Sequence, residues 1–265
     1  AQKKIPMVLS LHGMFQPWLW KKGTLKKKLY FYLLSKKYFA KAKIIHSITQ
    51  EETATIKSFF YNNVILEIPN LIAVDTINEE VKISNKNIVY LGRLNKTKGI
   101  DLLINAFAKI QNNEIKLIIA GRINAYKTEL ESLVKKLNIE DKVTFIGEVK
   151  DVQKRKLIQS AWVMASPTYS DVIGMVNLEA ASLKTPIITT YKTGLHKDWN
   201  INGGRLIHPN VTELKSALEE ALNWSLEKRN AQGELLFNFV KKEYSWENRI
   251  KDWELLYKKA INNEK

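Results

Sequence analysis

The chain of 265 residues contains no cysteine, which excludes a disulfide framework and a zinc–thiolate site. No apolar run is long enough to cross a bilayer, and no signal peptide is visible. Hydrophobic residues make up 45% of the chain, an ordinary share for a globular protein with a real core. These absences fit a folded protein of the reducing cytosol, and we expect a cytoplasmic location.

Acidic residues are missing from the first 50 positions, which hold eleven lysines and so carry most of the formal net charge of +15. This asymmetry is typical of contact with a polyanion, either nucleic acid or an anionic membrane. Arginine is sparse, and no RRM, KH or helix-turn-helix signature accompanies the lysines. We therefore expect no nucleic-acid partner and favour an anionic membrane surface, contacted through residues 1–50.

Residues 24–40 combine lysines with a stripe of apolar side chains. The stripe recurs at roughly helical spacing and comprises Leu25, Leu29, Tyr32, Leu33 and Phe39. A basic amphipathic helix with aromatic residues suits the inner surface of a membrane, where the protein would be peripheral. The alternative is a core helix with a solvated lysine face, and the pattern leaves both interpretations open.

From residue 87 onward, strand-like and helix-like segments alternate. We expect strands at 88–91, 115–120, 143–146, 162–165 and 186–190, with helices between them and an almost wholly helical end from 211 to 260. Alternation at this spacing indicates βαβ units and a parallel, doubly wound sheet, so the fold class is α/β. Residues 1–77 offer expected strands only at 7–11, 43–47 and 64–68, too few for an independent sheet covered on both faces.

The segment from Ser166 to Pro186 is the most informative for function. It follows a buried-strand run and offers a carboxylate at Asp171, a glycine at Gly174 and a helix-forming stretch that contains Glu179. A strand, a loop and a helix N-terminus bind phosphate, because unpaired N–H groups and the helix dipole point at the anion. Carboxylates on either side could accept hydrogen bonds from sugar hydroxyls. The segment therefore predicts a site for sugar plus phosphate.

A second anion-binding candidate is GRLNKTKG, from Gly92 to Gly99, directly after the expected strand 88–91. In open α/β sheets, ligands collect at the carboxyl ends of strands, which is where Arg93 and Lys98 emerge. Arginine supplies a planar two-pronged donor and lysine a compact charge, a pair suited to a diphosphate. The order of a Walker A loop is missing. Two surface cations beside a turn are the alternative.

The chain resembles the retaining glycosyltransferases of family 4, the group 1 transferases, which have two facing Rossmann domains in the GT-B architecture. The matching stretches are GRLNKTKG, KLIIAG, VTFIGEV, SPTYSDVIGMVNLEA and TPIITT, in this order. Upstream, SLHG, SITQEE and IPN resemble the later part of the family's acceptor domain. The resemblance implies a partial acceptor-side domain at 1–77 whose first half is missing, a linker at 78–86, a complete donor-binding domain at 87–243 and a closing helix at 244–265.

The resemblance also implies roles for the phosphate-binding residues. Arg93 and Lys98 would hold the diphosphate of a UDP- or GDP-type sugar donor and stabilise charge on the leaving group. Backbone N–H groups around Gly174, Met175 and Val176 would assist from the helix N-terminus. Catalysis without a metal ion or other cofactor would follow, and the sequence shows no DxD-type pair or His/Asp metal cluster.

Further residues would contact the rest of the donor. Glu179 would bind the ribose, and Val149 would lie beside the base. The family's first glutamate is replaced by Asp171, whose shorter arm alters the contact with the donor sugar. His12, in SLHG, resembles the histidine that faces the donor sugar from the acceptor domain. The alternative interpretation is that His12 has a structural role and forms hydrogen bonds with backbone groups.

These observations lead to one hypothesis and two alternatives. The leading one is a retaining glycosyltransferase that moves a sugar to a hydroxyl of a saccharide or lipid-linked acceptor during assembly of a cell-surface polysaccharide or lipopolysaccharide. One alternative is a related GT-B enzyme with a soluble acceptor. The other is a nucleotide-sugar binding module, or a truncated fragment, without independent catalysis.

Overall fold

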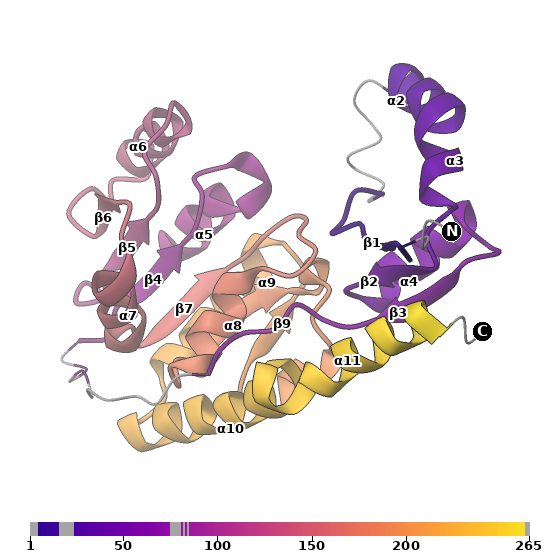
Figure 1. Ribbon diagram of the computed structural model, residues 1–265. Helices are drawn as coiled ribbons and strands as arrows, with labels where there is room; N and C mark the ends of the chain where they lie inside the picture. Colours follow the sequence, from indigo (N-terminus) through magenta and orange to yellow (C-terminus); the bar gives the residue numbers. More distant parts are fainter. Residues whose placement is uncertain (1–4, 16–23, 75–80, 82, 84, 263–265) are drawn as a thin grey trace. The chain divides into compact units, whose positions relative to one another are not determined.

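A computed structural model describes residues 5–15, 24–74, 81, 83 and 85–262 (Figure 1). The chain forms two compact units, the first from Ala1–Leu71 with Trp246–Lys265 and the second from Ile72–Ser245. In the sequence, the second unit is therefore inserted between the two segments of the first. Most of the predicted linker at 78–86 lies outside the described residues.

The described residues of the second unit build a six-stranded sheet in the order β6-β5-β4-β7-β8-β9, and each neighbouring pair is parallel. Its strands are β4 (Ile88–Leu91), β5 (Leu117–Ala120), β6 (Val143–Gly147), β7 (Val163–Ser166), β8 (Ile187–Thr190) and β9 (Arg205–Ile207). Three of them, β4, β7 and β8, are buried at every residue, and β5 is buried at all but one, which explains why they read as continuous apolar runs rather than alternating ones. The α/β prediction is confirmed.

Helices cover both faces of this sheet, because successive side chains of a strand point to opposite sides. Ile88 and Tyr90 pack in one apolar cluster, while Val89 and Leu91 pack in the other. The first cluster includes α5 (Ile100–Phe107), α6 (Tyr126–Lys136) and α9 (Val211–Leu222), and the second includes α7 (Asp151–Ser160), α8 (Met175–Ser182) and α10 (Leu226–Tyr244). The unit is a three-layer sandwich with two cores.

The strand order contains one reversal. The chain runs outward from β4 through β5 to β6, and then returns to the other side of β4 to build β7, β8 and β9. After β4 and after β7, the chain consequently turns to opposite faces of the sheet, to α5 and to α8. Such a switch point leaves a crevice outside the carboxyl ends of the strands, where α/β proteins bind their ligands.

The first unit contains a three-stranded parallel sheet, β1-β2-β3, from β1 (Val8–Ser10), β2 (Ile44–Ser47) and β3 (Val64–Glu67). One face packs on α4 (Gln50–Phe59) in a cluster rich in phenylalanine. The other packs on α11 (Trp246–Asn262), through Leu256 and Ala260. A helical segment follows β1, made of α2 (Thr24–Tyr30), a π-helical turn η1 (Phe31–Ser35) and α3 (Lys36–Phe39).

Three features differ from the sequence-based expectations. The expected helix at 24–40 is interrupted by its π-helical turn. Strand β9 was not predicted, because three residues after Gly203 and Gly204 give too short a pattern. The C-terminal helical run divides at Ser245, and its last helix belongs to the first unit. None of the described helices combines the length and apolar character needed to cross a membrane.

Candidate functional site

The loop after β4 is shaped by two local devices. Asn95 accepts a hydrogen bond from the N–H of Thr97 at 2.9 Å and so begins the short 3-10 helix η2 (Lys96–Lys98). Gly99 then takes a left-handed conformation with φ of 66°, and a Cβ there would lie 2.0 Å from the carbonyl oxygen of Pro167. Only glycine fits such a close approach. The loop after β4 is thereby pressed against the loop after β7.

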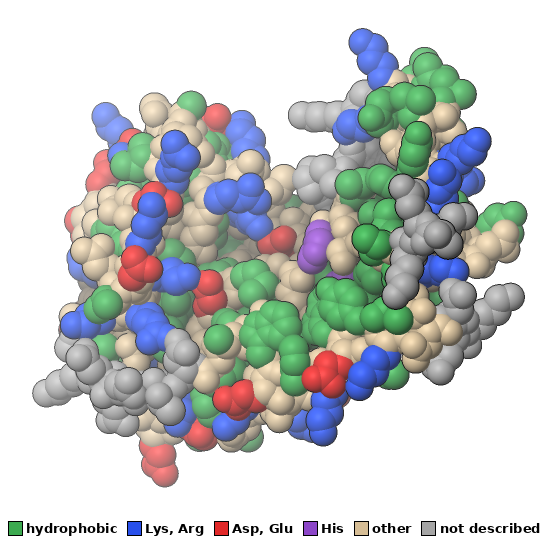
Figure 2. All heavy atoms as spheres, in the orientation of Figure 1, with side chains coloured by type: hydrophobic (Ala, Val, Ile, Leu, Met, Phe, Trp, Pro, Cys, Tyr) green, Lys and Arg blue, Asp and Glu red, His purple; other side chains and the backbone are tan. Residues whose placement is uncertain are grey.

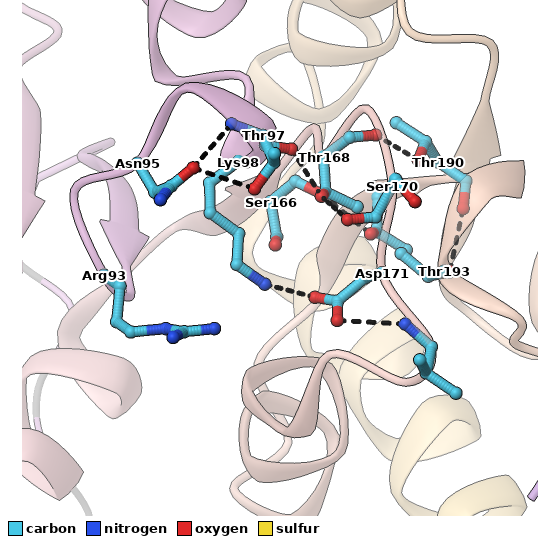
Figure 3. A network of polar contacts seen from close by, with 12 residues as sticks. Arg93, Asn95, Thr97, Lys98, Ser166, Thr168, Ser170, Asp171, Thr190 and Thr193 are labelled. Atoms are coloured by element: carbon cyan, nitrogen blue, oxygen red, sulfur yellow. Dashed lines mark hydrogen bonds and ion pairs between the residues drawn. The ribbon is translucent and has the colours of Figure 1, made fainter. Parts of the chain in front are cut away.

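Hydrogen bonds fix the loop after β7 in turn. The hydroxyl of Thr168 and the N–H of Tyr169 both donate to the carbonyl of Thr97, each at 2.8 Å. From the far side, the Thr190 hydroxyl at the end of β8 donates to the carbonyl of Thr168 at 2.7 Å. Figure 3 shows this network of buried and half-buried hydroxyls between the three strand ends. It holds Asp171 at a defined position without a regular element.

Lys98 and Asp171, predicted separately as ligands of phosphate and sugar, form an ion pair with each other. Their side chains are only 17% and 20% exposed, so water screens the pair less than it would screen a surface bridge. Figure 3 shows the side chain of Arg93 extending toward the same space as that of Lys98. The two cations and the carboxylate thus lie at the carboxyl ends of β4 and β7, at the switch point.

The buried hydroxyl of Tyr90, on β4, is surrounded by the same charges. It donates to the carbonyl of Arg93 at 2.9 Å. Burial raises the pKa of Tyr90, the negative charge of Asp171 raises it further, and the positive charge of Arg93 acts in the opposite direction. The tyrosine therefore stays protonated and holds the backbone of Arg93 in place.

Helix α8 begins at the same edge. Gly174 is its N-cap, and no described side chain caps the helix there. A Cβ on Gly174 would lie 3.2 Å from a carboxylate oxygen of Asp171 and 2.9 Å from the amide nitrogen of Asn177. The N–H groups of the first turn, from Gly174 through Met175 and Val176, have no partner within the helix and can bind an anion.

Asn177 was not identified from the sequence. Its residue is fully buried, yet neither its amide oxygen nor its amide nitrogen has a hydrogen-bond partner among the described residues. A buried amide without partners is costly, on the order of 1–3 kcal/mol. An asparagine between Val176 and Leu178, near the start of a helix-forming stretch, was the available signal.

Glu179, expected to bind a ribose, is half-buried and lies two residues after Asn177 in α8. It accepts a hydrogen bond from Lys154 of α7 at 2.9 Å, a partner that the sequence analysis did not identify. Val149, expected beside the base, is half-buried between β6 and α7 and packs against the second apolar cluster. Both residues belong to the second unit, as do Arg93, Lys98 and Asp171.

His12 belongs to the first unit. It is exposed, lies two residues after the end of β1, and has a left-handed backbone with φ of 44°. Glu52 holds this turn, because its buried carboxylate accepts the N–H of Gly13 at 2.5 Å and that of Ile48 at 2.8 Å. Thr49 and Glu52 form a helix-capping pattern, Thr-x-x-Glu, that was visible within SITQEE.

Within the described part of the chain, no three His, Cys, Asp or Glu side chains gather in a way that could hold a metal ion.

With this geometry in place, the chain can be compared with known proteins. The family model of glycosyl transferases group 1 matches residues 75–235, more than half of the chain. The chain belongs to this family. The family model covers almost the whole second unit, including both loops at the switch point.

Two curated relatives each match more than two thirds of the chain. The chain is 32% identical over 189 residues to an uncharacterised glycosyltransferase of Methanocaldococcus jannaschii, covering 68% of this chain and 47% of that protein. It is 26% identical over 205 residues to the gpi3 subunit of phosphatidylinositol N-acetylglucosaminyltransferase of Schizosaccharomyces pombe, covering 76% and 44%. The chain therefore spans about half the length of the curated relatives it matches.

Solved structures confirm the GT-B fold. Sucrose-phosphate synthase of Thermosynechococcus elongatus superposes with a TM-score of 0.83 at 20% identity, covering 99% of this chain and 70% of that one. HepE of Anabaena, in complex with UDP and glucose, superposes with a TM-score of 0.75 at 18% identity, covering 94% and 71%. Both units thus have the architecture expected from the sequence resemblance.

Proposed function

We propose that the protein is a retaining glycosyltransferase that moves a sugar from a nucleoside diphosphate donor to a hydroxyl of a saccharide or lipid-linked acceptor. The observation that carries this proposal is the convergence of Lys98, Arg93 and the uncapped start of α8 at the switch point of the sheet. These groups offer two cations and several N–H donors to one anion. A diphosphate fits that combination of charge and geometry.

In this proposal the site acts mainly through electrostatics. As the bond between the sugar and the diphosphate breaks, negative charge grows on the leaving phosphate oxygen. Arg93, Lys98 and the N–H groups of Gly174, Met175 and Val176 stabilise that charge, and no metal ion or other cofactor is needed. Glu179 binds ribose hydroxyls, with Lys154 orienting its carboxylate, and Val149 lies beside the base.

Donor binding also rearranges the ion pair between Lys98 and Asp171. Lys98 turns to the diphosphate, and the released carboxylate of Asp171 accepts hydroxyls of the donor sugar. His12 of the first unit faces that sugar during transfer. HepE, a structural neighbour, was crystallised with UDP and glucose, which supports a UDP-type donor, and GDP is the other candidate.

We further propose that the acceptor is reached at an anionic membrane surface, in the assembly of a cell-surface polysaccharide or lipopolysaccharide. Leu25, Leu29 and Leu33 on α2 and η1 are 83%, 60% and 68% exposed, instead of forming a core. Figure 2 shows basic and hydrophobic side chains side by side over α2 and α3. Leucines that insert among acyl chains, flanked by lysines that meet anionic headgroups, suit such a surface. The relative named for phosphatidylinositol supports a lipid acceptor.

Isothermal titration of this chain with UDP, GDP and ADP tests the donor site. We expect one of the diphosphates to bind, and Arg93→Ala to weaken it at least tenfold, because a charge-assisted hydrogen bond contributes about 1.5–3 kcal/mol. Lys116→Ala is the matched control, since Lys116 lies exposed just before β5, at the opposite end of the strands. Absence of binding to all three, or an equal loss in both variants, would contradict the proposal.

A further inference from the structure

A second pocket lies in the same unit, beside the proposed donor site but separate from it. It has a volume of about 550 Å³ and opens between η2, α5, α6 and the loop after β7. Its lining includes Asp101, Tyr126, Leu130, Leu133 and Tyr169. None of the residues assigned to the donor is among the described residues that line it. The donor contacts proposed above therefore leave this pocket unassigned.

Two tyrosine hydroxyls meet at the carboxylate of Asp101. The Tyr169 hydroxyl donates to one carboxylate oxygen at 3.1 Å, and the Tyr126 hydroxyl lies 3.4 Å from the other. Burial, followed by the charge of Asp101, raises the pKa of Tyr169 to about 12, so this hydroxyl remains a donor at neutral pH. The pocket thus combines a carboxylate acceptor and hydroxyl donors with two aromatic rings.

The charges around the pocket select against anionic ligands. Lys96 pairs with Glu129 at 2.7 Å, so these two exposed side chains neutralise each other. The negative charge of Asp101 is then left unbalanced in the lining and repels an anion. Its carboxylate already accepts hydrogen bonds from two tyrosine hydroxyls, which satisfy part of its acceptor capacity. Leu130 and Leu133 add apolar surface. A ligand with one hydroxylated edge and one apolar face matches this lining.

The pocket and the proposed donor site share the loop after β7. Tyr169 and Asp171 are separated by one residue in the loop after β7, and Asp171 pairs with Lys98. The N–H of Tyr169 donates to the carbonyl of Thr97, which itself belongs to the pocket lining. A ligand held against Tyr169 would therefore lie next to the site where the donor sugar is expected.

We propose that this pocket binds a neutral pyranose ring of the acceptor saccharide, with the ring hydroxyls on Asp101 and its C–H face on Tyr126 or Tyr169. The inference rests on the proposed transferase function and adds a saccharide subsite to the donor-binding unit. It assigns the pocket a specificity for uncharged sugars. A sugar bound there would position a growing glycan beside the donor.

The test uses the chain labelled with 3-fluorotyrosine and followed by fluorine NMR. Methyl glucoside, galactoside, mannoside, rhamnoside and N-acetylglucosaminide are titrated in turn, with methyl glucuronide as a charged comparison. Signals of Tyr126 and Tyr169 are assigned with the variants Tyr126→Phe and Tyr169→Phe. We expect at least one neutral glycoside to shift both signals, while the signal of Tyr61, 81% exposed in the first unit, stays unchanged.

Asp101→Asn should weaken that binding about tenfold, because a hydrogen bond to a carboxylate is roughly twice as strong as one to a neutral amide. Asp141→Asn, at an exposed position before β6, is the matched control and should leave the affinity unchanged. The proposal is overturned if no neutral glycoside shifts the two signals up to its solubility limit, if the glucuronide binds as well as the neutral sugars, or if both Asp variants behave alike. A UDP titration of the same sample reports separately on the donor site.

Discussion

The two units are both parallel α/β structures, yet they use their lysines in opposite ways. In the second unit, Lys98 and Lys154 each contact one carboxylate at the edge of a core. In the first unit, the lysines of α2 and α3 accompany exposed leucines and tyrosines, within a stretch of 50 residues that contains no carboxylate. One arrangement fixes a cation in a defined geometry, and the other creates a diffuse positive field.

Each arrangement suits a different anion. A charge with a fixed partner recognises a discrete ligand of matching shape, and its effect depends on orientation. A charge on an exposed helix attracts any negatively charged surface, with an effect that adds over residues and weakens with salt. If this comparison is correct, substitutions in one unit should leave the binding function of the other unchanged.

The largest effect is expected from the lysines of the first unit. Replacing Lys26, Lys28 and Lys37 by Gln should weaken binding to vesicles rich in phosphatidylglycerol by on the order of 100-fold at low salt, since each lysine contributes about 1 kcal/mol near such a surface. Vesicle flotation or surface plasmon resonance measures this, and UDP affinity should not change.

The matched control carries the same change of charge elsewhere. Lys109, Lys135 and Lys136 are exposed in the second unit, and their replacement by Gln should affect vesicle binding far less. Equal losses in the two triple variants would mean that net charge alone governs membrane contact, and the distinction between the units would fail.

The next largest effect is on UDP affinity, and it should have opposite signs for substitutions of Lys98 and of Asp171. Lys98→Ala should weaken UDP binding about 30-fold, because a cation that bonds the diphosphate is worth about 2 kcal/mol. Asp171→Asn should instead strengthen UDP binding severalfold, since Lys98 no longer has to leave a charged partner and a nearby negative charge is removed. Calorimetry gives both values.

A loss of UDP affinity in Asp171→Asn would contradict this assignment. It would show that the carboxylate supports Lys98 in the complex instead of competing with the diphosphate. Sugar transfer measured on the same variant separates the two roles further, because an Asp171 that contacts the donor sugar should lower turnover even where UDP binds more tightly.

Local sequence patterns were sufficient for most of the fold. Short apolar runs between polar loops located β4, β7 and β8, because buried parallel strands leave that signature regardless of the partner strand. The helical spacing of Leu25, Leu29 and Leu33 predicted a helix correctly. The spacing could not show whether the apolar face of this helix is buried in a core or exposed at the surface, because periodicity shows that an apolar face exists without showing what covers it.

The site was less accessible to sequence reasoning. The positions of Lys98 and Asp171 followed from the strand ends and the family resemblance, but their mutual pairing joins residues 73 positions apart. The same holds for Lys154 with Glu179 and for Asp101 with Tyr169, which meet only after the sheet order is set. Hydrogen-bond partners of this kind depend on tertiary geometry, for which a single sequence carries no local signal.

A third, smaller effect concerns the ribose contact. Glu179→Gln should weaken UDP binding about fivefold, since a charge-assisted hydrogen bond becomes a neutral one at a cost of about 1 kcal/mol. Lys154→Met should lower the affinity by less, because it leaves the carboxylate in place and removes only its orienting partner. Calorimetry with UDP and with uracil measures the loss for each variant, and unchanged UDP affinity in Glu179→Gln would remove the ribose role.

The smallest effect distinguishes the units by their response to acid. His46 is buried on β2, where its ring centroid lies 4.6 Å from that of Trp253 at an interplanar angle of 50°, and a ring nitrogen hydrogen-bonds the carbonyl of Ile68 at 2.8 Å. Burial lowers its pKa below the ordinary value of 6.5, outweighing the hydrogen bond that raises it. The unfolded chain therefore binds a proton first as the pH falls, so stability is retained above about pH 6.5 and declines below it.

Hydrogen exchange measured by mass spectrometry, peptide by peptide from pH 7.5 to 5.5 and corrected for the intrinsic exchange rate, checks this sign. Protection of β2 should fall with acid, whereas protection of β4 in the second unit should change little. His46→Gln should flatten the pH dependence of β2, while His208→Gln, at an exposed position in the second unit, should not. A β2 segment that gains protection on acidification would show that the ring is stabilised in its charged form, contrary to its burial.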